Sequence, residues 1–123
     1  MKTAVITILM LILVVAFVNA VSINTYGVDN ERVLNITSTI NPKHFEGVSQ
    51  LQIIYSKSKF LTADCWYYTN KKITCYIDWQ SDEWLKRNIL HEISHHKCFI
   101  KEGYMSIDNI NHIGCFQDEY PKI

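Results

Sequence analysis

The segment Leu90–His96 constrains this chain more than any other stretch, because it contains the pattern His-Glu-x-x-His. Two imidazoles four residues apart can bind one metal ion only when both lie on the same face of a helix. In this pattern the glutamate beside the first histidine is placed to act as a general base. The pattern therefore predicts a metal-binding helix with His91 and His95 as ligands and Glu92 as the catalytic carboxylate.

The residues around the pattern predict a long helix with normal ends. Ser81 is a favourable N-cap, Asp82 and Glu83 complement the helix dipole, and Gly103 suits the C-terminal cap. A helical projection predicts three groups: an apolar face of Leu85, Ile89, Ile93 and Ile100; a wet face of Arg87, Ser94, Lys97 and Lys101; and, between them, a border stripe of Trp84, Asn88, His91, His95 and Cys98. His96 falls within the apolar sector, which predicts a hydrogen-bonded histidine that either belongs to the core or supports a metal ligand, rather than a ligand itself.

Residues 1–20 have the features of a signal peptide. Lys2 provides the positive segment, residues 3–18 are nearly all apolar, and the segment 18–20 fits a small-residue cleavage site. The apolar run is shorter than the roughly 20 residues that a membrane span requires. We therefore expect a secreted or periplasmic protein whose residues 21–123 form a single domain. The alternative is a membrane anchor formed by an uncleaved N-terminal segment.

Charge and cysteine content limit the partners of the mature chain. Loss of Lys2 leaves eleven Lys and Arg against twelve Asp and Glu, a formal charge of −1. This balance predicts no nucleic-acid surface, and the sequence predicts a monomer with no stable membrane insertion after cleavage. The four cysteines all lie in the mature part, and an even count in an exported small domain predicts two disulfides.

A β-hairpin is predicted directly before the helix, with strands at residues 61–68 and 72–78 and a three-residue loop at residues 69–71. In this register Cys65 lies opposite Cys75, close enough for a disulfide. The first strand is expected to form a sheet edge above the metal site, where an extended peptide could add by backbone hydrogen bonds. Shorter strands are predicted at residues 33–37 and 51–55.

These elements predict an α+β fold. We expect a small, largely antiparallel sheet of three or four strands, with the hairpin leading into the metal helix and a second short helix near either end.

A third metal ligand is expected from the C-terminal segment. Cys98 lies one helical turn beyond His95, so a Cys98–Cys115 disulfide would bring His112 within reach of the metal. Carboxylates can also bind zinc, and the competing candidates are Glu102, Asp108, Asp118 and Glu119. Glu119 ranks second after His112.

The arrangement resembles the SprT/Spartan-like zinc metallopeptidases. The resemblance covers roughly residues 60–116 and rests on the hairpin segment 73–77, the helix residues 85–95, and the downstream His112 and Phe116. It implies zinc on His91, His95 and His112, with Glu92 as the catalytic carboxylate. The glycine of the downstream segment is Gly114 rather than residue 113, and the DNA-linked role of some members is not carried over to an exported chain.

The function expected from these features is that of an exported zinc peptidase acting on a peptide or protein substrate. Tyr104 and Tyr120 are candidate donors to the oxyanion by residue type alone. One alternative is a disulfide-stapled binding or inhibitor module with a degenerate metal pattern. Another is a structural zinc site in which Cys98 or Cys115 joins the histidines as a thiolate. Free-thiol titration and zinc content distinguish these possibilities.

Overall fold

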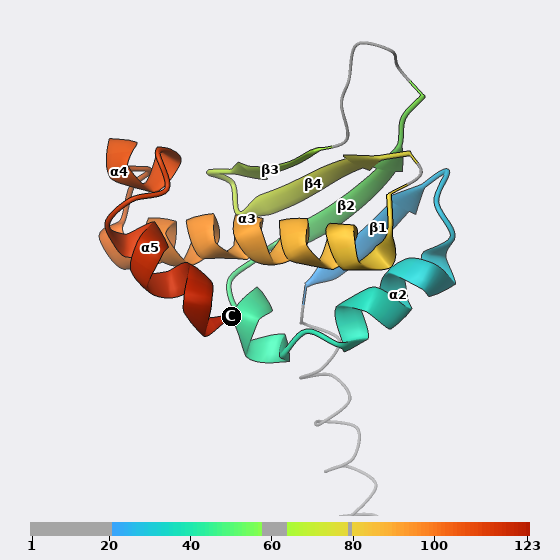
Figure 1. The fold of residues 1–123 in the computed structure, drawn as a ribbon, viewed down its shortest axis with the longest axis horizontal. Helices are drawn as coiled ribbons and strands as arrows, with labels where there is room; N and C mark the ends of the chain where they lie inside the picture. Colours follow the sequence, from blue (N-terminus) through green and yellow to red (C-terminus); the bar gives the residue numbers. More distant parts are fainter. Residues whose placement is uncertain (1–20, 58–63, 79) are drawn as a thin grey trace, which may run out of the picture.

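The computed structural model describes residues 21–57, 64–78 and 80–123 (Figure 1). The elements follow the order β1 (Ser22–Tyr26), α2 (Asn30–Ser38), the 3₁₀ helix η1 (Pro42–Phe45), β2 (Gln50–Tyr55), β3 (Asp64–Tyr68), β4 (Lys72–Ile77), α3 (Asp82–Glu102), α4 (Ile107–Ile110), α5 (Cys115–Glu119) and the 3₁₀ helix η2 (Tyr120–Lys122). The predicted leader, residues 1–20, and the first predicted hairpin residues, 61–63, lie outside the described residues. Among those that are described, no helix is long and apolar enough to cross a membrane.

The fold has two layers, a four-stranded sheet and a helical layer on one of its faces (Figure 1). Helix α3 packs against β3 and β4, and α2 packs against β1 and α3. The core between the layers includes Leu51, Ile53, Ile73, Cys75 and Ile77 from the sheet, Leu85, Ile89 and Ile93 from α3, and Val33 and Ile36 from α2. The predicted α+β class is confirmed.

The sheet is mixed, not largely antiparallel as predicted. Its order is β1-β2-β4-β3, in which β1 pairs with β2 and β2 with β4 in parallel, and only the β3–β4 hairpin is antiparallel. The cause is α2, which returns the chain from the end of β1 to the level of its start, so that β2 runs in the same direction. The sequence did not predict a strand at the residues that form β1.

The strand predicted at residues 33–37 is wrong, because these residues belong to α2. Val33 and Ile36 are buried and Leu34 is exposed, which is helical rather than alternating periodicity. The Asp29 side chain accepts a hydrogen bond from the Glu31 N–H at 3.1 Å and caps the helix. The β-branched residues of this segment favoured a strand, but the cap and the apolar spacing outweigh that preference.

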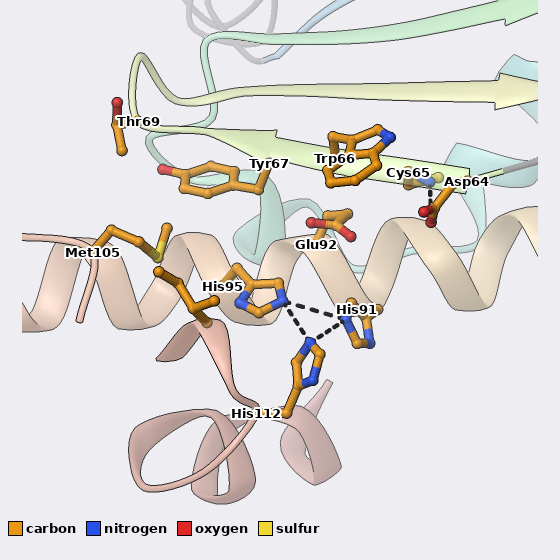
Figure 2. Close-up of a pocket in the computed structure, with 11 residues that line it drawn as sticks. Asp64, Cys65, Trp66, Tyr67, Thr69, His91, Glu92, His95, Met105 and His112 are labelled. Carbon is orange, nitrogen blue, oxygen red and sulfur yellow. Dashed lines mark hydrogen bonds between the residues drawn. The ribbon is translucent and has the colours of Figure 1, made fainter. Parts of the chain in front are cut away.

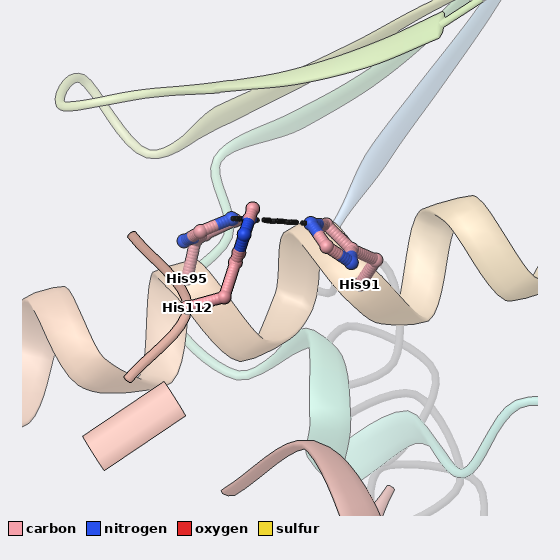
Figure 3. Close-up of side chains that lie close together, drawn as sticks. All are labelled: His91, His95 and His112. Carbon is pink, nitrogen blue, oxygen red and sulfur yellow. Dashed lines mark hydrogen bonds between the residues drawn. The ribbon is translucent and has the colours of Figure 1, made fainter. Parts of the chain in front are cut away.

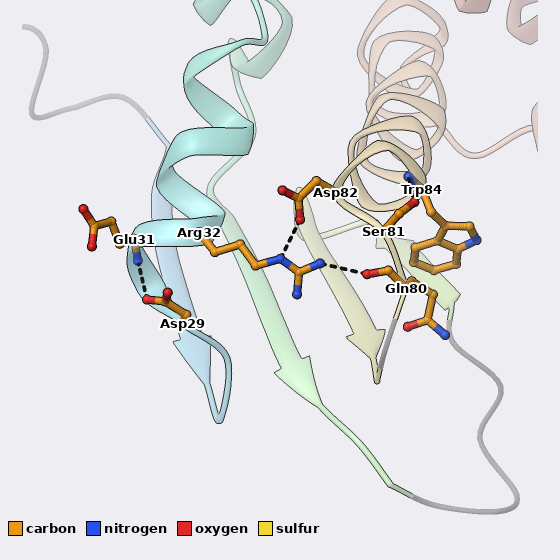
Figure 4. Close-up of polar contacts among 7 residues, drawn as sticks. All are labelled: Asp29, Glu31, Arg32, Gln80, Ser81, Asp82 and Trp84. Carbon is orange, nitrogen blue, oxygen red and sulfur yellow. Dashed lines mark hydrogen bonds and ion pairs between the residues drawn. The ribbon is translucent and has the colours of Figure 1, made fainter.

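Arg32 joins α2 to the start of α3 (Figure 4). Its Nε donates to an Asp82 carboxylate oxygen at 2.6 Å, and its second terminal nitrogen donates to the carbonyl oxygen of Gln80 at 2.8 Å. Because Asp82 also occupies the first turn of α3, this ion pair fixes the beginning of the predicted metal helix relative to α2.

Helix α3 begins and ends where the sequence predicts. The Ser81 hydroxyl accepts a hydrogen bond from the Trp84 N–H at 3.1 Å, and Gly103 forms a left-handed C-cap with φ of 83°. Two residues depart from the predicted faces: Ile100 is 50% exposed, and Ser94 is buried. Because α2, α5 and η2 also pack against α3, its buried surface is wider than one face, which is consistent with the burial of Ser94.

His96 is a core histidine, as predicted. It is 1% exposed, and its Nε2 donates to the backbone carbonyl oxygen of Glu46 at 2.8 Å. This leaves Nδ1 to accept a hydrogen bond from the Tyr67 hydroxyl at 2.8 Å. Burial raises the pKa of Tyr67 to about 12, so the hydroxyl keeps the proton that this bond requires.

The hairpin has the predicted register and disulfide. Cys65 pairs with Cys75, and the two form a disulfide. Their Cα atoms are 4.0 Å apart, a separation typical of opposed residues that share no ladder hydrogen bonds. The backbone N–H and C=O groups of Cys65 and of Tyr67, two residues on, therefore point to the open edge of the sheet. Strand β3 is that edge, and α3 runs beside it.

Candidate metal centre

Three imidazoles converge at the middle of α3 (Figure 3). His91 and His95 come from successive turns of α3, and His112 comes from the segment after α4. The Nε2 atoms of His91 and His95 are 3.3 Å apart, and each lies 3.1 Å from Nε2 of His112. The three nitrogens thus form a nearly equilateral triangle, and we call these residues the histidine triangle.

Hydrogen bonds alone cannot satisfy the histidine triangle. Nδ1 of His95 lies 2.8 Å from the Asn109 side-chain oxygen, while the Asn109 amide nitrogen donates to the His95 carbonyl oxygen at 3.0 Å. Nδ1 of His95 must therefore carry the proton, and its Nε2 presents a lone pair. Whichever tautomers His91 and His112 adopt, at least one of the three contacts then joins two donors or two acceptors. A cation at the centre removes this conflict.

The spacing of the histidine triangle fits a metal ion. Zinc binds imidazole nitrogen at about 2.0–2.1 Å in tetrahedral sites, which places any two ligand nitrogens about 3.3–3.4 Å apart. The observed separations of 3.1–3.3 Å approach this value. Within the described part of the chain, His91, His95 and His112 form a group that can hold a metal ion, and no further His, Cys, Asp or Glu belongs to it. A tetrahedral ion held by these three imidazoles would have one further position to fill.

Burial favours the neutral, metal-binding form of the α3 histidines. It lowers the pKa of His91 to about 4, with smaller contributions from the positive charges that His95 and His112 would carry. Burial also lowers the pKa of His95, although its hydrogen bond to Asn109 opposes this effect. At neutral pH no proton has to be displaced from these imidazoles for a metal ion to bind.

His112 reaches the triangle through an unusual backbone path. It has a φ of 62°, in the left-handed region that non-glycine residues rarely adopt, and its N–H donates to the Asn109 carbonyl oxygen at 3.2 Å. Gly114 follows with φ of 61° and ψ of −122°, a combination that a side chain would strain. The Cys98–Cys115 disulfide then ties this segment to α3. The predicted pairing is confirmed.

We expect removal of this disulfide to affect both stability and the site. A Cys98→Ala/Cys115→Ala double variant should lose about 3 kcal/mol of unfolding free energy, because it releases a loop with a sequence separation of 17 residues. It should also weaken metal binding, because His112 lies in that loop. Urea denaturation and chelator competition measure the two effects. The matched control, Cys65→Ala/Cys75→Ala, should lose stability while keeping metal affinity, and equal metal affinity in both double variants would contradict the expectation.

Phe116 packs against all three imidazoles. Its ring centroid lies 4.9, 4.6 and 4.7 Å from those of His91, His95 and His112, respectively, and the side chain is buried. Tyr120 stacks on Phe116 at 5.5 Å and lies 5.8 Å from the ring of His91. These aromatic rings restrict the rotamers of the triangle from the side of α5 and η2.

The triangle borders a cleft of about 450 Å³ between β3 and α3 (Figure 2). Its lining comprises Asp64, Cys65, Trp66, Tyr67, Thr69, His91, Glu92, His95, Met105, Ile110 and His112. Figure 2 shows Glu92 between α3 and the edge strand, above the imidazoles. The edge strand, the histidines and the predicted catalytic carboxyl therefore share one cavity.

Glu92 is a buried carboxyl at the wall of this cleft. Burial, aided by the nearby charge of Asp64, raises the pKa of Glu92 to about 8, while a hydrogen bond from the Tyr67 backbone opposes the shift. At neutral pH such a carboxyl is mostly protonated, and it can act as a general base only once it is ionised, which a cation held by the neighbouring imidazoles would favour.

The competing carboxylate ligands lie elsewhere. Glu119 faces Lys122 at 3.7 Å and Lys101 at 4.0 Å, outside the lining of the cleft. Asp108 and Asp118 are exposed and belong to no metal-binding group among the described residues. Glu102 groups with Cys98 and Cys115, but the disulfide occupies both sulfur atoms. Tyr104 is 61% exposed and does not line the cleft, whereas Tyr120 lies beside the triangle.

Asn109 is the residue that sequence reasoning missed. It is fully buried and contacts His95 through both side-chain polar atoms. The sequence carries only an indirect signal, namely that Ser106 can cap a helical turn and thereby place Asn109 on its inner side.

A comparison of this chain with models of protein families, with curated proteins and with solved structures found no match. The two disulfides point to an oxidising compartment, where such bonds form and persist.

Proposed function

We propose that this chain is an exported zinc-dependent peptidase, directed out of the cytoplasm by residues 1–20. The observation that carries the proposal is the histidine triangle beside a buried glutamate at the wall of one cleft. Catalytic zinc sites use three protein ligands and keep a fourth position for water or substrate, whereas structural sites are closed by four. Three imidazoles with an open position support the catalytic type.

The order of the elements supports a relationship to the SprT/Spartan-like metallopeptidases. In both, a hairpin precedes the helix with the His-Glu-x-x-His pair, and a third histidine follows downstream. We infer the zinc ligands His91, His95 and His112, and the catalytic role of Glu92, from this order together with the geometry of the site.

His91, His95 and His112 would hold the zinc ion, which would supply Lewis acidity for the scissile carbonyl and for the attacking water. Glu92 takes one proton from the water while the water oxygen forms a bond to the carbonyl carbon. It then passes this proton to the departing nitrogen as the carbon–nitrogen bond breaks. One water is consumed, and a carboxylic acid and an amine are released. The imidazoles keep their relative positions because Phe116 and the Cys98–Cys115 disulfide hold them.

The edge strand supports an extended peptide as the substrate. The outward N–H of Cys65 already donates to Asp64 at 2.8 Å, and that of Tyr67 to Glu92. The backbone carbonyl oxygens of Cys65 and Tyr67 are then the groups that can accept hydrogen bonds from the N–H groups of a bound peptide. A substrate would therefore align along β3 mainly through its own N–H donors, directly above the triangle.

Two alternatives make different demands on the cysteines and on the imidazoles. The cysteine-ligated structural site is incompatible with the disulfides, since no free cysteine occurs among the described residues. In a metal-free binding or inhibitor module, no cation would resolve the unfavourable contact among the three Nε2 atoms. Its distinguishing property is that the native protein would contain no zinc.

Metal removal combined with a broad peptide library tests the proposal. The disulfide-bonded domain purified with equimolar zinc should cleave members of the library. Treatment with a chelator should abolish cleavage, and added zinc should restore it, because the carbonyl loses its Lewis acid without the metal. A protein that holds stoichiometric zinc yet cleaves nothing in the library would instead favour a structural or binding role.

A further inference from the structure

We propose that Asn109 is a positioning residue for the metal site, which selects the tautomer of His95 and ties His95 to the segment that carries His112. The inference rests on the metal site of the proposed function, but not on peptidase activity. It assigns a specific role to a residue that neither the His-Glu-x-x-His pattern nor the cleft lining indicates.

The geometry of Asn109 is that of a clamp on one ligand. Its side chain is 0% exposed; its oxygen accepts from Nδ1 of His95 at 2.8 Å, and its amide nitrogen donates to the carbonyl oxygen of His95 at 3.0 Å. Because the two bonds go to the ring and to the backbone of the same residue, they fix the imidazole relative to its own helix turn. The amide orientation is determined as well, since the carbonyl can only accept.

The consequence is a defined protonation pattern at the site. An amide oxygen facing Nδ1 requires the proton there, so Nε2 of His95 is kept as a lone pair facing His91 and His112. A histidine ligand that donates its other N–H is both oriented and made more basic toward the metal. Without Asn109, His95 would be free to place its proton on Nε2 and would then have to lose it before binding a metal.

Asn109 also connects the second ligand-bearing segment. Its backbone carbonyl accepts from the N–H of His112 at 3.2 Å, and its own N–H donates to the Ser106 hydroxyl at 3.0 Å. Ser106 in turn donates to a Glu102 carboxylate oxygen at 3.2 Å, at the end of α3. Asn109 therefore connects the end of α3, through Ser106, to His112. These hydrogen bonds hold the backbone of His112 in its left-handed conformation.

The test compares Asn109→Ala, Asn109→Asp and the control Asn111→Ala in the disulfide-bonded protein. Asn111 is an exposed residue of the same segment, two positions away. Chelator competition measures zinc affinity, nitrogen-15 chemical shifts of the imidazoles report the His95 tautomer in the metal-free protein, and thermal unfolding reports folding.

We expect Asn109→Ala to weaken zinc binding about 10–100-fold, the usual cost of removing a partner that supports a ligand. It should also move the His95 proton from Nδ1 toward Nε2. Asn109→Asp should recover most of the affinity and the wild-type tautomer, because a carboxylate still accepts from Nδ1. Asn111→Ala should match wild type.

Zinc affinity and a His95 tautomer that both stay at wild-type values in a folded Asn109→Ala protein would overturn the proposal. If Asn109→Ala does not fold, the His95 tautomer of Asn109→Asp provides the test. The proposal requires Nδ1 to stay protonated in that variant, and a proton found on Nε2 would overturn it. A wild-type protein that binds no zinc would count against the proposed function, whereas an Nδ1-protonated His95 in that protein would still support the role of Asn109 in selecting the tautomer.

Discussion

Replacement of any member of the histidine triangle by alanine should abolish stoichiometric zinc binding. A site with three protein ligands loses a third of its donors, and a metal ion held by two imidazoles is far more exposed to exchange with water. The loss of zinc affinity in His91→Ala, His95→Ala and His112→Ala should be larger than the loss of about 10–100-fold that is typical when a residue supporting a ligand is replaced. Metal content after dialysis and chelator competition measure it.

The chain offers two matched controls for this expectation. His44 lies outside the cleft, with its Nδ1 2.9 Å from the Lys97 ammonium, so His44→Ala should retain zinc. Glu119, the competing candidate from sequence, faces lysines and should also be dispensable as Glu119→Gln. If Glu119→Gln strips the metal while His112→Ala does not, the third ligand is a carboxylate, and the assignment of His112 is wrong.

Glu92→Gln should separate catalysis from metal binding. The amide keeps the size of the side chain but cannot take the proton of the attacking water, so cleavage should fall at least about a hundredfold, the low end for a positioned general base. Zinc content and thermal unfolding should change little, because Glu92 is not a member of the histidine triangle. Initial rates on a peptide that the wild-type protein cleaves give the measurement.

Glu119→Gln is again the matched control, since it removes a carboxylate outside the cleft and should leave the rate unchanged. Loss of activity in both variants would indicate a general effect of charge rather than a base. A Glu92→Gln protein that cleaves at the wild-type rate would refute the mechanism while leaving the metal site intact.

The sequence by itself determined the features that depend on local spacing. The i, i+4 placement of His91 and His95, the Ser81 and Gly103 caps and the Cys65–Cys75 register follow from helical and strand geometry within a few residues. The Cys98–Cys115 pairing followed because the first disulfide left only two cysteines.

Only the tertiary structure decided the features that depend on distant segments packing together. The parallel pairing of β1 and β2 follows from the return path through α2, which the β-branched residues of that segment obscured. The burial of Ser94 and the exposure of Ile100 depend on which segments cover α3, not on its periodicity. The positions of Asn109 and His112 depend on a capped turn and a left-handed backbone, because a buried polar group must find its partners wherever the folded chain brings them.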